Sequence, residues 1–85
     1  MIGSQVTVAA TATQILAADD IHRRVLFHVV GNSIVYLGGS NVTTSTGFYI
    51  DKASGVIPID IPPKRALYGI VSTGTEVVTV LVSEL

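Results

Sequence analysis

A largely apolar stretch of the chain, residues 23–30, reads RRVLFHVV. Because successive side chains of a β-strand point to opposite faces, one face of this stretch carries Val25, Phe27 and Val29. The opposite face is largely apolar as well. A strand with two apolar faces is covered on both sides, so the stretch predicts a central strand of a layered β structure.

The composition and spacing around this strand also favour β structure. Valine, isoleucine and threonine make up 31 of the 85 residues, and these β-branched types prefer strands. Apolar runs are separated by Gly, Asn, Ser, Pro or Asp, as in sandwiches and barrels. The ranges that predict strands are 5–9, 14–17, 23–30, 34–37, 48–51, 56–61, 66–72 and 76–85, although 14–17 would suit a short helical turn equally well.

Two local features refine this map. Gly31-Asn32-Ser33 is typical of a tight turn, and it predicts a hairpin between the strands at 23–30 and 34–37. Pro58 has no N–H to donate to a neighbouring strand, so the strand at 56–61 is expected at a sheet edge or at a bulge.

The predicted fold is a single all-β domain over residues 1–85. Seven to eight short strands would leave one apolar face wet in a single sheet. We therefore expect two small sheets packed face to face, as a small antiparallel β-sandwich or jelly roll.

The apolar surplus predicts association. The second apolar faces of the strands at 23–30 and 76–85 cannot all be interior in so small a domain, and exposed apolar patches usually mark contact surfaces. Phe48 and Tyr49 are adjacent, so they point to opposite faces and one ring is expected outside. The interface candidates are Phe48, Tyr49, Phe27, Val77 and Leu81.

The polar, glycine-rich segment at residues 38–47 predicts an exposed loop. Its expected surface residues are Gly39, Ser40, Asn41, Thr43 and Thr44.

Charge and composition argue against several classes of partner. A net charge of −1 gives no basic stripe for nucleic acid. No run of about 18 apolar residues predicts a membrane span, and no secretory signal is recognisable, so we expect synthesis in the cytoplasm. The absence of cysteine excludes disulfides and thiolate chemistry.

No group of residues predicts catalysis. His22 and His28 lie six residues apart, too far for joint metal ligation, and they are expected to be packing or surface residues. Asp51 and Asp60 lack the aromatic cleft of a glycosidase and are expected to be edge charges. We expect a protein with no enzymatic activity, no metal and no cofactor.

Several motifs together resemble a known family. A strand opens with Arg23-Arg24. A later strand reads Val35-Tyr36-Leu37-Gly38-Gly39-Ser40 and leads into a Val42-Thr43-Thr44 loop. The segment from Ala66 to Val71 reads ALYGIV, and it is followed by a Ser72 to Thr75 turn and a valine-rich last strand. This arrangement, from Arg23 to the end, resembles small virion structural proteins of tailed bacteriophages.

The resemblance implies a β-sandwich, often trimeric, on a shell or tail. Its first implication is a capsid decoration or cement protein that associates with itself and with the major capsid protein at the capsid surface. The alternative is a tail fibre or spike module that binds a host glycan or protein through the loop at 38–47.

Overall fold

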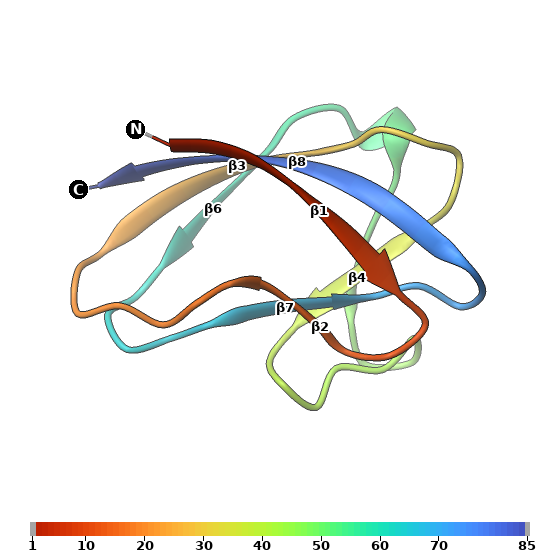
Figure 1. Cartoon of the computed structure of the whole chain (residues 1–85), viewed down its shortest axis with the longest axis horizontal. Coiled ribbons are helices and arrows are strands. Elements are labelled where there is room, and N and C mark those ends of the chain that lie inside the picture. Colours follow the sequence, from red (N-terminus) through yellow and green to blue (C-terminus); the bar gives the residue numbers. More distant parts are fainter. Residues whose placement is uncertain (1, 85) are drawn as a thin grey trace.

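The computed structural model describes residues 2–84, with side chains for residues 3–83, and is built almost entirely of strands (Figure 1). One 3-10 turn, η1 (Lys52–Ser54), is the only helical element in this range. The strands are β1 (Ile2–Ala9), β2 (Thr13–Leu16), β3 (Arg23–Val29), β4 (Val35–Gly38), β5 (Phe48–Ile50), β6 (Ile57–Ile61), β7 (Leu67–Ile70) and β8 (Thr75–Glu84).

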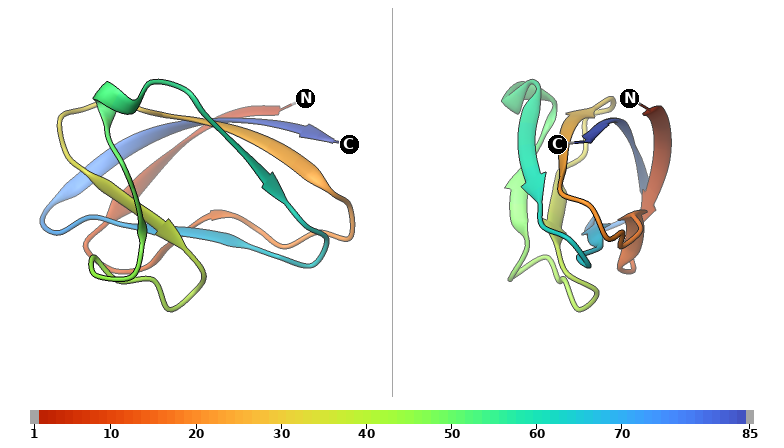
Figure 2. Two further views of the ribbon diagram at one scale, coloured as in Figure 1. Left: turned by 180° about the vertical axis from the view of Figure 1, so that it is seen from behind. Right: turned by 90° about the vertical axis from the view of Figure 1, so that its left-hand side faces the viewer.

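The strands form two four-stranded antiparallel sheets. Sheet A has the order β1-β8-β3-β6, and sheet B has the order β2-β7-β4-β5. The pairs are nested in the sequence, because β4 pairs with β5, β3 with β6, β2 with β7 and β1 with β8. One folded ribbon therefore rolls up into two sheets, which is the connectivity of a jelly roll (Figures 1 and 2).

The core lies between the two sheets and is aliphatic except for Phe27. On β3, every inward side chain is buried, and the outward side chains between them are exposed or half-buried. The same alternation on β8 buries Val78 and Val80. Sheet B contributes the other half of the core, with Ile15, Val35, Leu37, Ile50 and Leu67.

The predicted sandwich is confirmed, with eight strands. The strand containing Pro58 lies at an edge of sheet A, as its missing N–H predicted. The ambiguous segment at 14–17 belongs to a short strand, Thr13–Leu16, with a register shift between Gln14 and Leu16.

The predicted hairpin at Gly31-Asn32-Ser33 is wrong. Both sides of β3 are occupied, by β8 and β6, so β4 cannot pair with it and lies in the other sheet. Residues 30–34 therefore cross from one sheet to the other. Gly31 does not have a positive φ; a Cβ there would collide with the carboxylate of Glu76.

Candidate interaction surfaces

An apolar row crosses the outer face of sheet A from edge to edge. In the register of the sheet, Gly3 lies opposite Leu81, Leu81 opposite Leu26, and Leu26 opposite Pro58. These four residues, the apolar row, come one from each strand. Leu26 and Leu81 are half-buried, although no second layer of the described part of the chain covers this face.

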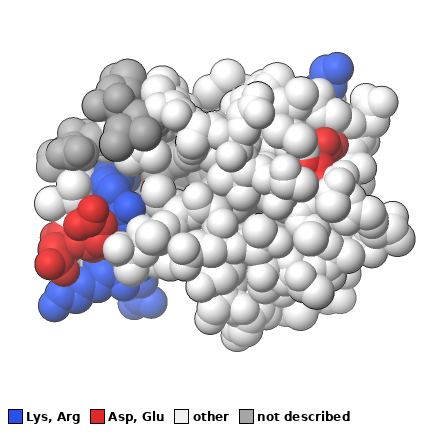
Figure 3. All heavy atoms as spheres, in the orientation of Figure 1, with Lys and Arg blue, Asp and Glu red and all other residues white. Residues whose placement is uncertain are grey.

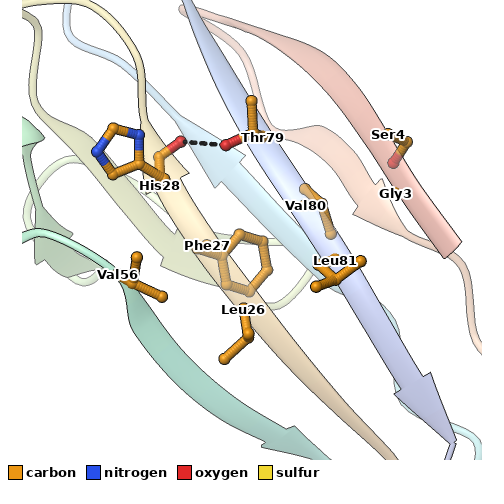
Figure 4. Close-up of a pocket in the computed structure, with 9 residues that line it drawn as sticks. All are labelled: Gly3, Ser4, Leu26, Phe27, His28, Val56, Thr79, Val80 and Leu81. Carbon is orange, nitrogen blue, oxygen red and sulfur yellow. Dashed lines mark hydrogen bonds between the residues drawn. The ribbon is translucent and has the colours of Figure 1, made fainter. Parts of the chain in front are cut away.

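Three members of the apolar row, Gly3, Leu26 and Leu81, line an open groove of about 340 Å³ (Figure 4). Figure 4 shows Leu26, Val56 and Leu81 around it, and the Thr79 hydroxyl donates a 3.3 Å hydrogen bond to the carbonyl oxygen of His28. Val56 is 60% exposed. The groove is lined mainly by apolar side chains, which suits contact with another surface better than chemistry.

The interface candidates from the sequence separate into three classes. Val77 and Leu81 lie on the outer face of sheet A and are half-buried. Phe48 and Tyr49 are 63% and 52% exposed. Phe27 was expected at an interface, but it is fully buried with Val25 and Val29 and belongs to the core. The alternation of side chains along the strand predicted that Val25 and Val29 share a face with Phe27, but it did not predict that this face is the inner one.

Phe48 is exposed because the sandwich is open at one side. It lies opposite Leu37 in the β4–β5 pairing, on the face that is buried elsewhere. Edge strand β6 of the other sheet leaves a groove of about 380 Å³ there, which we call the open seam. Its lining residues are Leu37, Gly38, Phe48, Ile57, Pro58, Ile59 and Leu67.

The three tyrosines of the chain come from adjacent strands of sheet B and share its outer face. Tyr36 of β4 lies opposite Tyr49 of β5, and the two rings meet edge to face with centroids 6.1 Å apart. Tyr68 of β7 lies opposite Gly38 and donates a 3.2 Å hydrogen bond to Gln14. We call Tyr36, Tyr49 and Tyr68 the tyrosine face. Sequence spacing does not predict the tyrosine face, because its three residues are far apart in the chain and only the strand register brings them together.

Tyr49 also makes a polar contact at this face. Its hydroxyl donates a 3.0 Å hydrogen bond to Asp51, whose other carboxylate oxygen accepts from the backbone N–H and hydroxyl of Ser54. These bonds hold the pKa of Asp51 below its ordinary value, chiefly through Tyr49, and the carboxylate raises the pKa of Tyr49. Asp51 therefore fixes both the tyrosine ring and the start of η1.

The loop beside the tyrosine face is a folded turn. Thr43 and Thr46 bond through their hydroxyls at 3.0 Å, and the N–H of Gly47 donates to the carbonyl oxygen of Thr43. Val42 is buried and anchors the loop from below. The five predicted surface residues Gly39, Ser40, Asn41, Thr43 and Thr44 are all exposed.

Most of the charged groups in view gather at one end of the molecule, and a smaller group lies toward the opposite end, with an uncharged stretch between them (Figure 3). At the first of these, the charged end, Arg24 pairs with Asp60 at 2.9 Å, and the backbone N–H of Lys64 donates to the carbonyl oxygen of Asp19. Arg24 holds the pKa of Asp60 below its ordinary value.

Buried Arg23 supports the same end from inside. It is 5% exposed, and its guanidinium donates to the carbonyl oxygens of Ala17 and Arg65 at 2.9 and 3.2 Å. Its neighbour Arg24 forms an ion pair, whereas Arg23 bonds to backbone carbonyls.

The residues weighed for chemistry do not come together. Asp51 caps η1 after β5, Asp60 lies in β6, and each has its own structural partner. Among the residues that the structure describes, no group of three or more His, Cys, Asp or Glu side chains is arranged to hold a metal ion. None of these residues form a helix long and apolar enough to cross a membrane.

The chain was compared with protein-family models, curated proteins and solved structures, and none of them matches it.

Proposed function

We propose that this chain is a non-enzymatic structural protein of a bacteriophage virion, a capsid decoration protein that associates with itself and with the major capsid protein. The main support is the surface. Only 13% of the residues are charged, most of the charges in view gather at one end, and an apolar row crosses the outer face of sheet A. Interfaces between proteins are depleted of charge and enriched in apolar and aromatic groups.

The architecture suits this role. A decoration protein needs a rigid scaffold with exposed apolar contacts rather than a catalytic cleft. Jelly rolls occur in viral capsid proteins, which is an analogy at the level of the fold. Several copies joined together would bind a shell at several sites at once, so weak contacts per subunit would suffice.

The test is addition of purified protein to undecorated shells. We expect it to sediment with the shells and to raise their resistance to heat and osmotic shock. Leu26→Lys places a charge in the apolar row and should abolish both effects, whereas Thr44→Lys in the exposed loop should not. Wild-type protein that leaves the shells unchanged would contradict the proposal.

A second candidate is a host-binding module of a tail fibre or spike. The tyrosine face beside the loop at 38–47 favours it, because aromatic rings with polar tips are suited to contacts that are partly apolar and partly wet. Binding on a glycan array that is lost in Tyr36→Ala but kept in Leu26→Lys would support this candidate over the decoration protein.

A further inference from the structure

The four edge strands of the sandwich differ in how well they are protected against pairing with another chain. Edge strand β6 contains Pro58 and Asp60, β2 is four residues long with a register shift, and β5 has three residues. Prolines, charges, irregularities and short lengths all discourage pairing at an edge. Strand β1 is eight residues long, pairs with β8 without a register shift, and contains no proline or charged residue.

The hydrogen bonds of the sheet show which backbone groups of β1 are free. The carbonyl oxygen of Val77 accepts from Val30, on the β3 side of β8. Because residues of an antiparallel strand alternate between their two neighbours, Thr7, which lies opposite Val77, directs its N–H and carbonyl away from β8. Ala9 agrees, since its N–H donates to Thr13 and its carbonyl oxygen accepts from Val71.

The same alternation turns the N–H and carbonyl of Gly3, Gln5 and Thr7 to the open side. All three residues are exposed, and no loop or side chain among the described residues hydrogen-bonds to them. In the right-hand view of Figure 2, β1 lies at one outer edge of the molecule, with β6 toward the other side. The hydrogen bonds that β1 makes to Thr13 and Val71 are made by Ala9, beyond this segment.

We propose that β1 pairs antiparallel with β1 of a second copy of this chain, about a twofold axis at Gln5. In this register Gln5 lies opposite Gln5 of the second copy, and Gly3 lies opposite Thr7. Each of these three pairs exchanges two backbone hydrogen bonds, so the contact forms about six. The two copies of sheet A become one continuous eight-stranded sheet.

A second copy suits this edge because the segment from Gly3 to Thr7 is complementary to its own antiparallel copy. Its side chains are small or neutral, so the antiparallel register brings no like charges together, and the two Gln5 amides can bond to one another. A twofold contact of this kind uses the same surface on both subunits and closes on itself. The inference does not depend on the virion proposal, which concerns what the assembled protein binds.

The test uses the mass of the purified full-length protein by light scattering. We expect two chains per particle. Gln5→Lys and Gln5→Glu each place like charges opposite one another at the axis and should weaken association by about tenfold or more at low salt. An equal mixture of the two variants should form the dimer again, because residue 5 then pairs with its opposite charge.

Gln14→Lys, on the short edge strand β2, is the matched control and should leave the dimer intact. Circular dichroism and thermal unfolding verify that each variant is folded. A wild-type monomer, a wild-type trimer, or a dimer that persists in both charged variants would overturn the proposal. So would a mixture that stays monomeric although both variants are folded. Loss of shell binding with the dimer intact would contradict only the decoration role.

Discussion

The carboxylate of Glu76, at the start of β8, accepts a 2.8 Å hydrogen bond from the backbone N–H of Ser33 in the crossing between the sheets. Its second oxygen accepts from the N–H of Val77 at 2.9 Å. The side chain is 7% exposed and packs against Gly31. One buried carboxylate thus holds the connection that the sequence analysis took for a hairpin.

Replacement of Glu76 should destabilise the fold. Glu76→Ala leaves the part-buried N–H groups of Ser33 and Val77 without their acceptor, which costs about 1–3 kcal/mol for an unsatisfied group. Glu76→Gln keeps one acceptor oxygen and should cost less. Urea unfolding measures both, with Asp20→Asn on the exposed surface as the control. Equal stability of Glu76→Ala and the wild type would show that the carboxylate does not hold the crossing.

The two phenylalanines should respond differently to the same substitution. Phe27→Ala removes a fully buried ring and should lower the free energy of unfolding by about 3–5 kcal/mol. Phe48→Ala removes a ring that is 63% exposed and should cost the monomer about 1 kcal/mol or less. Chemical denaturation compares them. A similar loss in both variants would contradict the open seam.

Glycines in and beside the exposed loop offer another matched pair. A Cβ at Gly47 would collide with Cβ of Tyr36 and lie 3.0 Å from the carbonyl oxygen of Thr43, so Gly47→Ala should destabilise the fold by about 1–3 kcal/mol. At Gly39 the nearest atom is Asn41 Oδ1 at 3.6 Å, and Gly39→Ala should stay within about 0.5 kcal/mol of the wild type. Thermal unfolding checks both; a destabilised Gly39→Ala variant with an unchanged Gly47→Ala variant would contradict this packing.

The ion pair at the charged end predicts a dependence of stability on pH. Arg24 holds the pKa of Asp60 below its ordinary value of 3.8, so the unfolded chain binds more protons at Asp60 between the two pKa values. The contribution of Asp60 is therefore fully present above pH 3.8 and is lost as the pH falls through the lower, folded pKa. The pKa of Asp51 is lowered too, so it acts in the same direction.

Urea unfolding at a series of acid pH values tests this dependence. Asp60→Asn should show a shallower loss of stability than the wild type as the pH falls, and high salt should reduce the difference because the pair is exposed. Identical profiles for the variant and the wild type would show that Arg24 and Asp60 do not interact in solution.

Local patterns predicted the strands well, and the fold class followed from them. The missing N–H of Pro58 limits the strand at 56–61 to a sheet edge or a bulge, and the structure places it at an edge. Membership of a sheet is not local: the Gly31-Asn32-Ser33 turn failed as a hairpin signal because distant strands occupy both sides of β3.

The surfaces were harder to predict for the same reason. Phe27 and Phe48 look equivalent in the sequence, and only the packing of the sheets buries one and opens a groove beside the other. The tyrosine face depends on the register of three strands, and the role of Glu76 depends on a crossing that the hairpin prediction excluded. The spacing of residues within a short stretch of sequence predicts neither the packing of the sheets nor the register of distant strands.

The nested pairing of the strands has a consequence for synthesis on the ribosome. The innermost pair, β4 with β5, is joined by the exposed loop between Gly38 and Phe48. The outermost pair joins β1 to β8, which are separated by most of the chain. Closing such distant ends is slow, because the entropy of the intervening chain is lost before the contact forms. During synthesis β1 is therefore without its partner strand until β8 has been made, and its backbone groups are open to other contacts until then.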